Sequence, residues 1–249
     1  MTLRDAVGLL RKHYGSPAAP PATDPFALIL WETVVYLAPA ARRREAFEEL
    51  SRTIGTTPAA ILKANRKALE RVTARGILRR TSAEKLRKAA RIALEQFDGD
   101  LAPVIRGPIG EATRGLRLFP GIGEPGAEKI LLLTGRAPLL APDSNGLRVL
   151  VRVGLVHEGA SYAKTYAQSR NLAPTISSDP VAVKEAHLLL QQHGQTLCKR
   201  TAPRCGECPL AMGCAYALSV RGASRRSQKS PAGRKVPAPA PSRLRSVSR

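Results

Sequence analysis

Apolar residues recur at three- and four-residue spacing along most of the chain, which is the period of an α-helix that buries one face. Glycine and proline interrupt this pattern at short intervals, and no stretch shows the two-residue alternation of a half-buried strand. We therefore expect an all-α protein with short connections. The predicted helices cover residues 26–37, 42–54, 65–75, 81–97, 110–118, 123–134, 143–153, 162–170 and 180–193, and one more starts at Thr57 and Pro58.

Several of these helices have recognisable start signals. Asp24 followed by Pro25 predicts an N-cap and a first helical residue, because Asp accepts free backbone N–H groups and Pro lacks one. Thr81 with Glu84 three residues later has the pattern of a capping box, which predicts that the next helix begins there.

The chain is strongly basic, with a formal net charge of +21 and a pI near 10.9 over 249 residues. Such a field favours a polyanion, and double-stranded DNA is the partner we expect. Residues 219–249 are predicted to form a disordered tail, since they hold nine Lys or Arg, no acid, and many Pro, Ser and Ala. Without those nine charges the body still carries about +12. No apolar run is long enough to span a membrane.

All four cysteines fall in one stretch, at Cys198, Cys205, Cys208 and Cys214. Four thiolates at this C-x6-C-x2-C-x5-C spacing can hold one zinc ion or one iron–sulfur cluster. Two disulfides are the alternative, but nothing like a secretory signal precedes the first helix, and a cytoplasmic chain keeps its thiols reduced.

Three cations lie between the first two cysteines: Lys199, Arg200 and Arg204. A loop held by metal at both ends would keep these charges in place for contact with DNA phosphates. The alternative is that they are ordinary solvated surface charges.

Residues 118–126 read LFPGIGEPG and predict a tight turn between two helices. Gly121 and Gly123 allow the backbone to approach a partner closely, and the following helix offers free N–H groups at its positive end. This arrangement binds a phosphate without reading base sequence.

The hairpin, Asp143 and the cysteine spacing, in this order, make residues 24–217 resemble the endonuclease III family of base-excision DNA glycosylases. The resemblance implies two helical lobes. Residues 25–136 would form a helical barrel containing the hairpin at about 116–134, and residues 1–24 with 137–218 would hold a [4Fe–4S] cluster. It also implies a monomer in the nucleoid of a bacterial-type cell, with duplex DNA between the lobes and one nucleotide flipped out.

The same resemblance predicts which chemistry is kept. Bifunctional relatives carry a Lys nucleophile just after the hairpin, where this chain has Pro125, so a monofunctional hydrolase is expected. Lys129, one turn further along, is expected to contact a DNA phosphate or to face solvent, with catalysis as the alternative.

Two carboxylates are the predicted catalytic pair. Asp143 would stabilise the oxocarbenium-like transition state and orient water, and its alternative role is that of a helix N-cap. Glu32 interrupts an apolar run, so burial should raise its pKa and suit it to protonate the leaving base; the alternative is a solvated edge position. Tyr36, where relatives have a gap-filling Gln, is predicted to wedge into DNA or to lie in the core.

Two other functions remain open at this point. The chain could be a catalytically silent protein that binds lesions or junctions on the same scaffold. It could also be a bifunctional glycosylase and lyase that uses a non-standard Lys.

Overall fold

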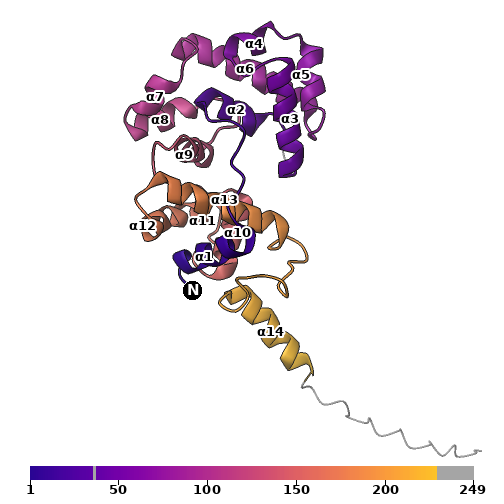
Figure 1. The fold of residues 1–249 in the computed structure, drawn as a ribbon, viewed down its shortest axis with the longest axis vertical. Coiled ribbons are helices and arrows are strands. Elements are labelled where there is room, and N and C mark those ends of the chain that lie inside the picture. Colours follow the sequence, from indigo (N-terminus) through magenta and orange to yellow (C-terminus); the bar gives the residue numbers. More distant parts are fainter. Residues whose placement is uncertain (36–37, 229–249) are drawn as a thin grey trace, which may run out of the picture.

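The computed structural model describes residues 1–35 and 38–228, and helices make up all the regular secondary structure in that part of the chain (Figure 1). The prediction of an all-α protein is confirmed. One lobe contains α2 (Pro25–Thr33), α3 (Ala40–Thr53), α4 (Pro58–Lys63), α5 (Arg66–Thr73), α6 (Arg79–Phe97), α7 (Ala102–Arg106), α8 (Ile109–Leu116) and α9 (Glu124–Leu133). The other contains α1 (Leu3–Tyr14), α10 (Ser144–Val153), α11 (Tyr162–Ser169), a 3₁₀ turn (Arg170–Leu172), α12 (Ala173–Ile176), α13 (Pro180–Thr196) and α14 (Ala215–Gln228).

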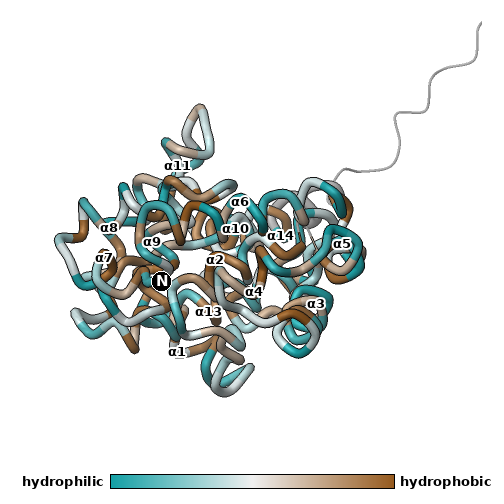
Figure 2. The backbone as a smooth tube through the Cα atoms, turned by 90° about the horizontal axis from the view of Figure 1, so that it is seen from above, coloured by the Kyte–Doolittle hydropathy of each residue, from teal (hydrophilic) through white to brown (hydrophobic). Residues whose placement is uncertain are grey.

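Each lobe has its own buried apolar core. The first core is built around α2, and Figure 2 shows hydrophobic positions concentrated around this helix. Helix α2 is buried on nearly every side because its sequence, PFALILWET, has no polar stripe. The second core combines α1 with α10, α11, α13 and the start of α14, so the N-terminal helix packs against the C-terminal half of the chain.

A buried ionic contact joins the two lobes. Glu128 of α9 accepts a hydrogen bond from the Tyr166 hydroxyl of α11 at 2.5 Å, and the Arg170 Nε donates to the same carboxylate at 2.9 Å. Helix α9 also contacts α13. The lobes are therefore held together at α9, the helix that follows the hairpin.

Local start signals were correct at α2 but wrong at α6. Asp24 caps α2 by accepting from the Ala27 N–H at 3.0 Å. The capping box predicted from Thr81 and Glu84 is absent, because α6 begins at Arg79 and Thr81 lies inside it. Glu84 instead pairs with Arg66 across to α5 at 3.2 Å, a tertiary contact that the local pattern could not reveal.

The C-terminal prediction also changes. Helix α14 continues to Gln228, so residues 219–228 are helical and not part of a disordered tail. The rest of the predicted tail and Tyr36 lie outside the described residues. No helix in the described part of the chain has the length and apolar character that a membrane crossing requires.

Candidate active site and DNA interface

Asp143 is fixed at the N-terminus of α10 by four hydrogen bonds. Its Oδ1 accepts from the backbone N–H groups of Asn145 and Gly146 at 2.9 and 2.8 Å. Its Oδ2 accepts from the Gln191 side chain at 2.9 Å and from the Asn145 amide at 3.2 Å. Asp143 is therefore the N-cap that its sequence context suggested, and its carboxylate is held in one orientation.

The helix behind Asp143 is α13. Gln191 reaches Asp143 from this helix, and one turn later Gly194 lies directly against the backbone of Asn145. A Cβ at Gly194 would be 2.5 Å from the Asn145 carbonyl oxygen, so only glycine allows α10 and α13 to approach this closely. The position of Asp143 thus depends on two residues of α13 that lie more than 40 positions away in the sequence.

Glu32 of α2 forms an ion pair with Lys129 of α9. The Lys129 Nζ is 2.5 Å from Glu32 Oε2, and Arg43 of α3 lies 3.8 Å from Oε1. The Glu32 and Lys129 side chains are only 14% and 11% exposed. Glu32 is therefore neither on a solvated edge nor unpaired in the core.

Charges and hydrogen bonds around the two carboxylates keep both of them ionised. Burial opposes ionisation of Glu32, but Lys129 and Arg43 outweigh it, and the pKa of Glu32 is lowered from its ordinary value. The prediction of a raised pKa is wrong, because it took account of burial and not of the two cations. Burial also opposes ionisation of Asp143, but hydrogen bonds from Gly146 and Gln191, with nearby Lys129, lower its pKa as well.

Lys129 is not placed as the sequence suggested. It is 9% exposed and paired with Glu32, so it neither faces solvent nor extends toward a phosphate on the surface. Its charge acts on Asp143 as well as on Glu32, which shows that the two carboxylates share one electrostatic environment.

His187 of α13 also belongs to this environment, and the sequence reasoning missed it. Its ring is 1% exposed, and it interacts electrostatically with Lys129, Asp143 and Glu32. The sequence signal that could have indicated His187 is its position four residues before Gln191, because this spacing places both residues on the same face of a helix.

The LFPGIG segment forms the expected turn between α8 and α9. Gly121 has a φ of 86°, a left-handed conformation that glycine adopts without strain, and Gly123 precedes the first residue of α9. No side chain caps this helix, so its first N–H groups are available to a ligand. A Cβ at Gly121 would be 3.6 Å from the Lys85 Nζ of α6, so a free ammonium stands beside the turn.

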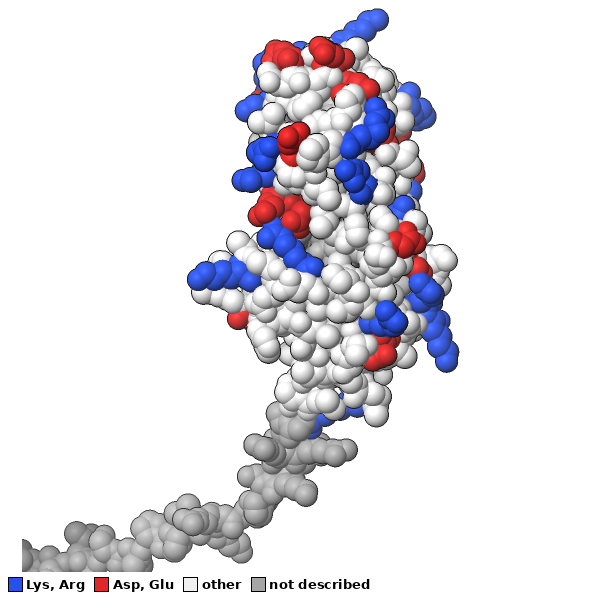
Figure 3. All heavy atoms as spheres, turned by 90° about the vertical axis from the view of Figure 1, so that its left-hand side faces the viewer, with Lys and Arg blue, Asp and Glu red and all other residues white. Residues whose placement is uncertain are grey.

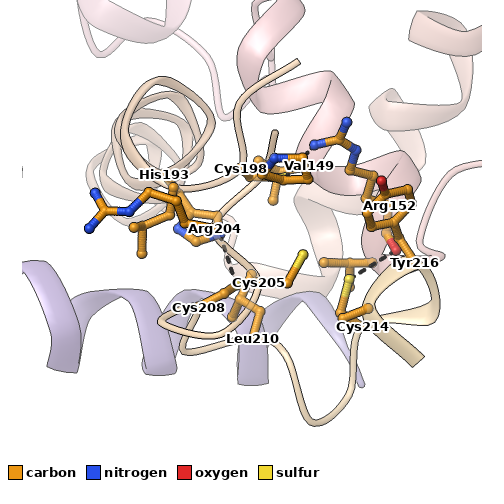
Figure 4. Close-up of a pocket in the computed structure, with 14 residues that line it drawn as sticks. Val149, Arg152, His193, Cys198, Arg204, Cys205, Cys208, Leu210, Cys214 and Tyr216 are labelled. Atoms are coloured by element: carbon orange, nitrogen blue, oxygen red, sulfur yellow. Dashed lines mark hydrogen bonds between the residues drawn. The ribbon is translucent and has the colours of Figure 1, made fainter. Parts of the chain in front are cut away.

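The four cysteines line one pocket between α10, the end of α13 and the start of α14 (Figure 4). None of them is in a disulfide, so the alternative of two disulfides is wrong. Within the described residues, no three His, Cys, Asp or Glu side chains are arranged to hold a single metal ion. Four thiols lining one pocket are a donor set that suits a sulfur-ligated metal centre, either a zinc ion or an iron–sulfur cluster.

Two arginines of α10 hold the loop after Cys198. Arg148 donates to the carbonyls of Gly194 and Cys198 at 2.7 and 2.9 Å, and Arg152 donates to the Lys199 carbonyl at 2.7 Å. The loop is therefore fixed to the same helix that Asp143 caps.

This loop presents its cations unequally. Lys199, Arg200 and Arg204 are all exposed. Arg204 differs from the other two because it pairs with Glu207, its Nε lying 2.9 Å from Oε1. Figure 3 shows that Lys and Arg side chains are spread over both lobes on the face it displays, with acidic groups between them. The basic charge is thus distributed along the molecule rather than gathered in one patch on that face.

No family model matches the chain. Its sequence is similar to that of a thymine/uracil-DNA glycosylase of Pyrobaculum aerophilum, with 23% identity over 84% of this chain and 88% of that protein. Endonuclease III of Escherichia coli is 26% identical over 67% of this chain and 72% of that protein. An adenine DNA glycosylase of Mycobacterium tuberculosis is 26% identical over 80% of this chain and 62% of that protein.

Solved structures give the fold. A non-covalent endonuclease III–DNA complex superimposes with a TM-score of 0.72 at 18% identity, covering 88% of this chain and 97% of that one. The chain has the endonuclease III fold. A thermostable thymine-DNA glycosylase superimposes with a TM-score of 0.69 at 16% identity, covering 87% and 97%. The predicted fold class is confirmed.

Proposed function

We propose that this protein is a base-excision DNA glycosylase that hydrolyses the N-glycosidic bond of a damaged or mispaired nucleotide flipped out of double-stranded DNA. The observation that carries the proposal is the ionised Asp143, held by four hydrogen bonds in an environment shared with Glu32 and Lys129. The similarity to curated DNA glycosylases and the endonuclease III fold support it.

Asp143 carries the main electrostatic role. As the bond between C1′ and the base breaks, the base leaves with the electron pair and positive charge develops on the sugar. A fixed carboxylate next to that charge stabilises the transition state and needs no reorientation during the step. The four hydrogen bonds supply that fixed orientation.

The Glu32–Lys129 pair serves the leaving base. Because Glu32 is ionised in the free protein, it is not itself a ready acid, but the Lys129 ammonium donates to it at 2.5 Å. A proton from this ammonium can pass through Glu32 to a leaving purine, and the same cation can stabilise a pyrimidine that leaves as an anion. The pair is thus compatible with either class of base.

The backbone of the hairpin and nearby cations would bind the DNA. Gly121, Gly123 and the start of α9 would hold one phosphate together with Lys85, and Lys199 and Arg200 would contact another part of the duplex. Tyr36 remains the proposed wedge into the base stack. The exposed pair Ile77 and Leu78, 75% and 42% exposed, offers a second apolar tip for the same task. One monomer on double-stranded DNA is the assembly we propose.

The cysteine pocket would hold a [4Fe–4S] cluster, with Cys198, Cys205, Cys208 and Cys214 as ligands. When bound, the cluster would fix the loop of Lys199 and Arg200 and take no part in bond cleavage. Broad visible absorption of the purified protein with about four irons per chain would support this, whereas a colourless protein with one zinc would contradict it.

Strand cleavage by an amine is the second candidate activity. Pro125 offers no nucleophile, which favours a monofunctional enzyme, but the Lys129 ammonium lies in the site beside Glu32. Attack by this amine on the sugar C1′ would give a Schiff base and a lyase.

Base release from a panel of duplexes tests the proposal. The panel contains uracil, thymine opposite guanine, adenine opposite oxidised guanine, and oxidised pyrimidines, and borohydride is added to a parallel abasic duplex. We expect base release from at least one duplex, with no covalent adduct. An adduct that disappears in Lys129→Met would establish the lyase instead. Tight lesion binding without any base release would support the silent DNA-binding protein and contradict catalysis.

A further inference from the structure

One face of α13 is directed at the proposed catalytic Asp. His187, Gln191 and Gly194 are spaced at i, i+4 and i+7, which places them on the same side of the helix. Gln191 donates to Asp143 and Gly194 packs on Asn145, so this side faces the N-terminus of α10. His187 is the remaining member of the set and has no place in the mechanism described so far.

His187 is a buried polar group with an unpaired ring nitrogen. Its ring is 1% exposed, and within the described residues its Nδ1 has no hydrogen-bond partner. The ring also interacts with the backbone of Ala141. Leaving such an atom buried and unpaired costs free energy, so Nδ1 calls for a polar partner that the protein itself does not supply.

Charged groups from three other elements interact electrostatically with this ring. They are Glu32 of α2, Lys129 of α9, and Asp143 at the start of α10, while Arg43 of α3 lies behind Glu32. Burial and then Lys129 lower the pKa of His187 to about 4, so at neutral pH the imidazole is uncharged. A neutral imidazole that donates through one nitrogen accepts through the other. With the proton on Nε2, Nδ1 is a hydrogen-bond acceptor on the face of α13 that also carries Gln191.

We propose that His187 binds the attacking water through this nitrogen and accepts its proton. The inference rests on the proposed glycosylase function. The C1′–N bond breaks and the base takes the electron pair; the water oxygen then forms the new C1′–O bond. The water proton passes to His187 Nδ1, and the resulting imidazolium is stabilised by Asp143 and Glu32 until the proton returns to solvent. Asp143 is left free to stabilise the sugar cation.

The test compares two substitutions in the full-length protein. His187→Leu removes the acceptor, whereas His187→Asn keeps an acceptor near the position of Nδ1. Single-turnover base release on a duplex that the wild type processes should fall about 100-fold in the Leu variant and much less in the Asn variant. His157→Asn, at an exposed histidine, is the matched control and should leave the rate unchanged.

A product ratio separates a water-binding role from a structural one. In aqueous methanol, the sugar is captured either by water or by methanol, and the ratio of abasic product to methyl glycoside reports how the nucleophile is held. Loss of one hydrogen bond to water should shift this ratio toward the methyl glycoside about fivefold in His187→Leu and leave it unchanged in His187→Asn.

The experiment distinguishes failure of the proposed glycosylase function from failure of the proposed role of His187. If the wild type releases no base from any duplex, the glycosylase function fails. If the wild type is active but His187→Leu, folded by its melting curve, keeps both the rate and the product ratio, the role of His187 is refuted. Should the Leu variant not fold, a shifted product ratio in folded His187→Asn would equally overturn the proposal.

Discussion

Replacing Gly194 with Ala should displace the turn that carries Asp143. The added Cβ would lie 2.5 Å from the Asn145 carbonyl oxygen, 2.7 Å from its carbon and 2.8 Å from its Cβ. Because ordinary van der Waals contact begins at 3.4 Å, the two helices must separate by about 0.9 Å. Most of the atoms in the way are backbone, so no side-chain rotation can relieve the contact.

The effect on stability follows from two opposing contributions. Alanine in a helix interior is favoured over glycine by about 1 kcal/mol, while overpacking a close contact costs about 1–3 kcal/mol. We therefore expect Gly194→Ala to lower the free energy of unfolding by about 1 kcal/mol. Displacement of a catalytic group by about 1 Å can cost about 100-fold in rate, so base release should fall far more than stability.

Gly8→Ala is the matched control. Gly8 also lies within a helix, α1, but nothing is within 4 Å of the position of its Cβ. This variant should gain up to about 1 kcal/mol and keep full activity. Urea unfolding and single-turnover base release are measured on both proteins. If Gly194→Ala is as stable and as active as Gly8→Ala, the close packing of α10 on α13 does not position Asp143.

Three further predictions concern ionisable groups. Lys85→Ala should weaken DNA binding regardless of sequence and reduce the slope of log K against log salt by about 1, measured by fluorescence anisotropy; an unchanged slope would exclude a phosphate contact at this residue. Glu32→Gln should destabilise the protein by about 3 kcal/mol, because it leaves Lys129 buried and unpaired. The double variant with Lys129→Met should recover most of that loss, as measured by urea unfolding. Equal stability of the single and double variants would argue against the buried pair. The pKa of His187 is about 4 in the folded protein and 6.5 in the unfolded chain, so its contribution to stability is complete above pH 6.5 and is lost as the pH falls toward 4. The free energy of unfolding should therefore decline less between these pH values in His187→Leu than in the wild type. An identical decline in the two proteins would contradict the burial of a neutral imidazole.

The sequence was sufficient for the fold because its signals are local or are spacings along the chain. Helical periodicity, Gly-Pro punctuation and the cap at Asp24 each depend on residues within a few positions of one another. The hairpin glycines and the N-cap geometry of Asp143 could be predicted for the same reason. The wrong start of α6 shows the limit, since Glu84 is used in a contact with Arg66 on another helix.

The electrostatics of the site could not be predicted in this way. The pKa of Glu32 depends on Lys129 and Arg43, which come from two other helices and approach it only in the folded protein. Considered alone, burial predicts a raised pKa for Glu32, which is the opposite of the direction found. The contributions of α13 could not be predicted either, because Gln191 and His187 approach the site only when that helix packs on α10.

The most direct test of the central claim is the single-turnover rate of base release in Asp143→Asn, compared with Asp179→Asn, on a duplex that the wild type processes. Both residues are helix N-caps: Asp179 accepts from the Val181 N–H at 2.9 Å at the start of α13. Asparagine caps a helix about as well as aspartate, so both variants should fold with near wild-type stability. We predict a loss of at least about 100-fold in Asp143→Asn and none in Asp179→Asn. Equal rates in the two variants would contradict the claim that the charge on Asp143 drives base excision.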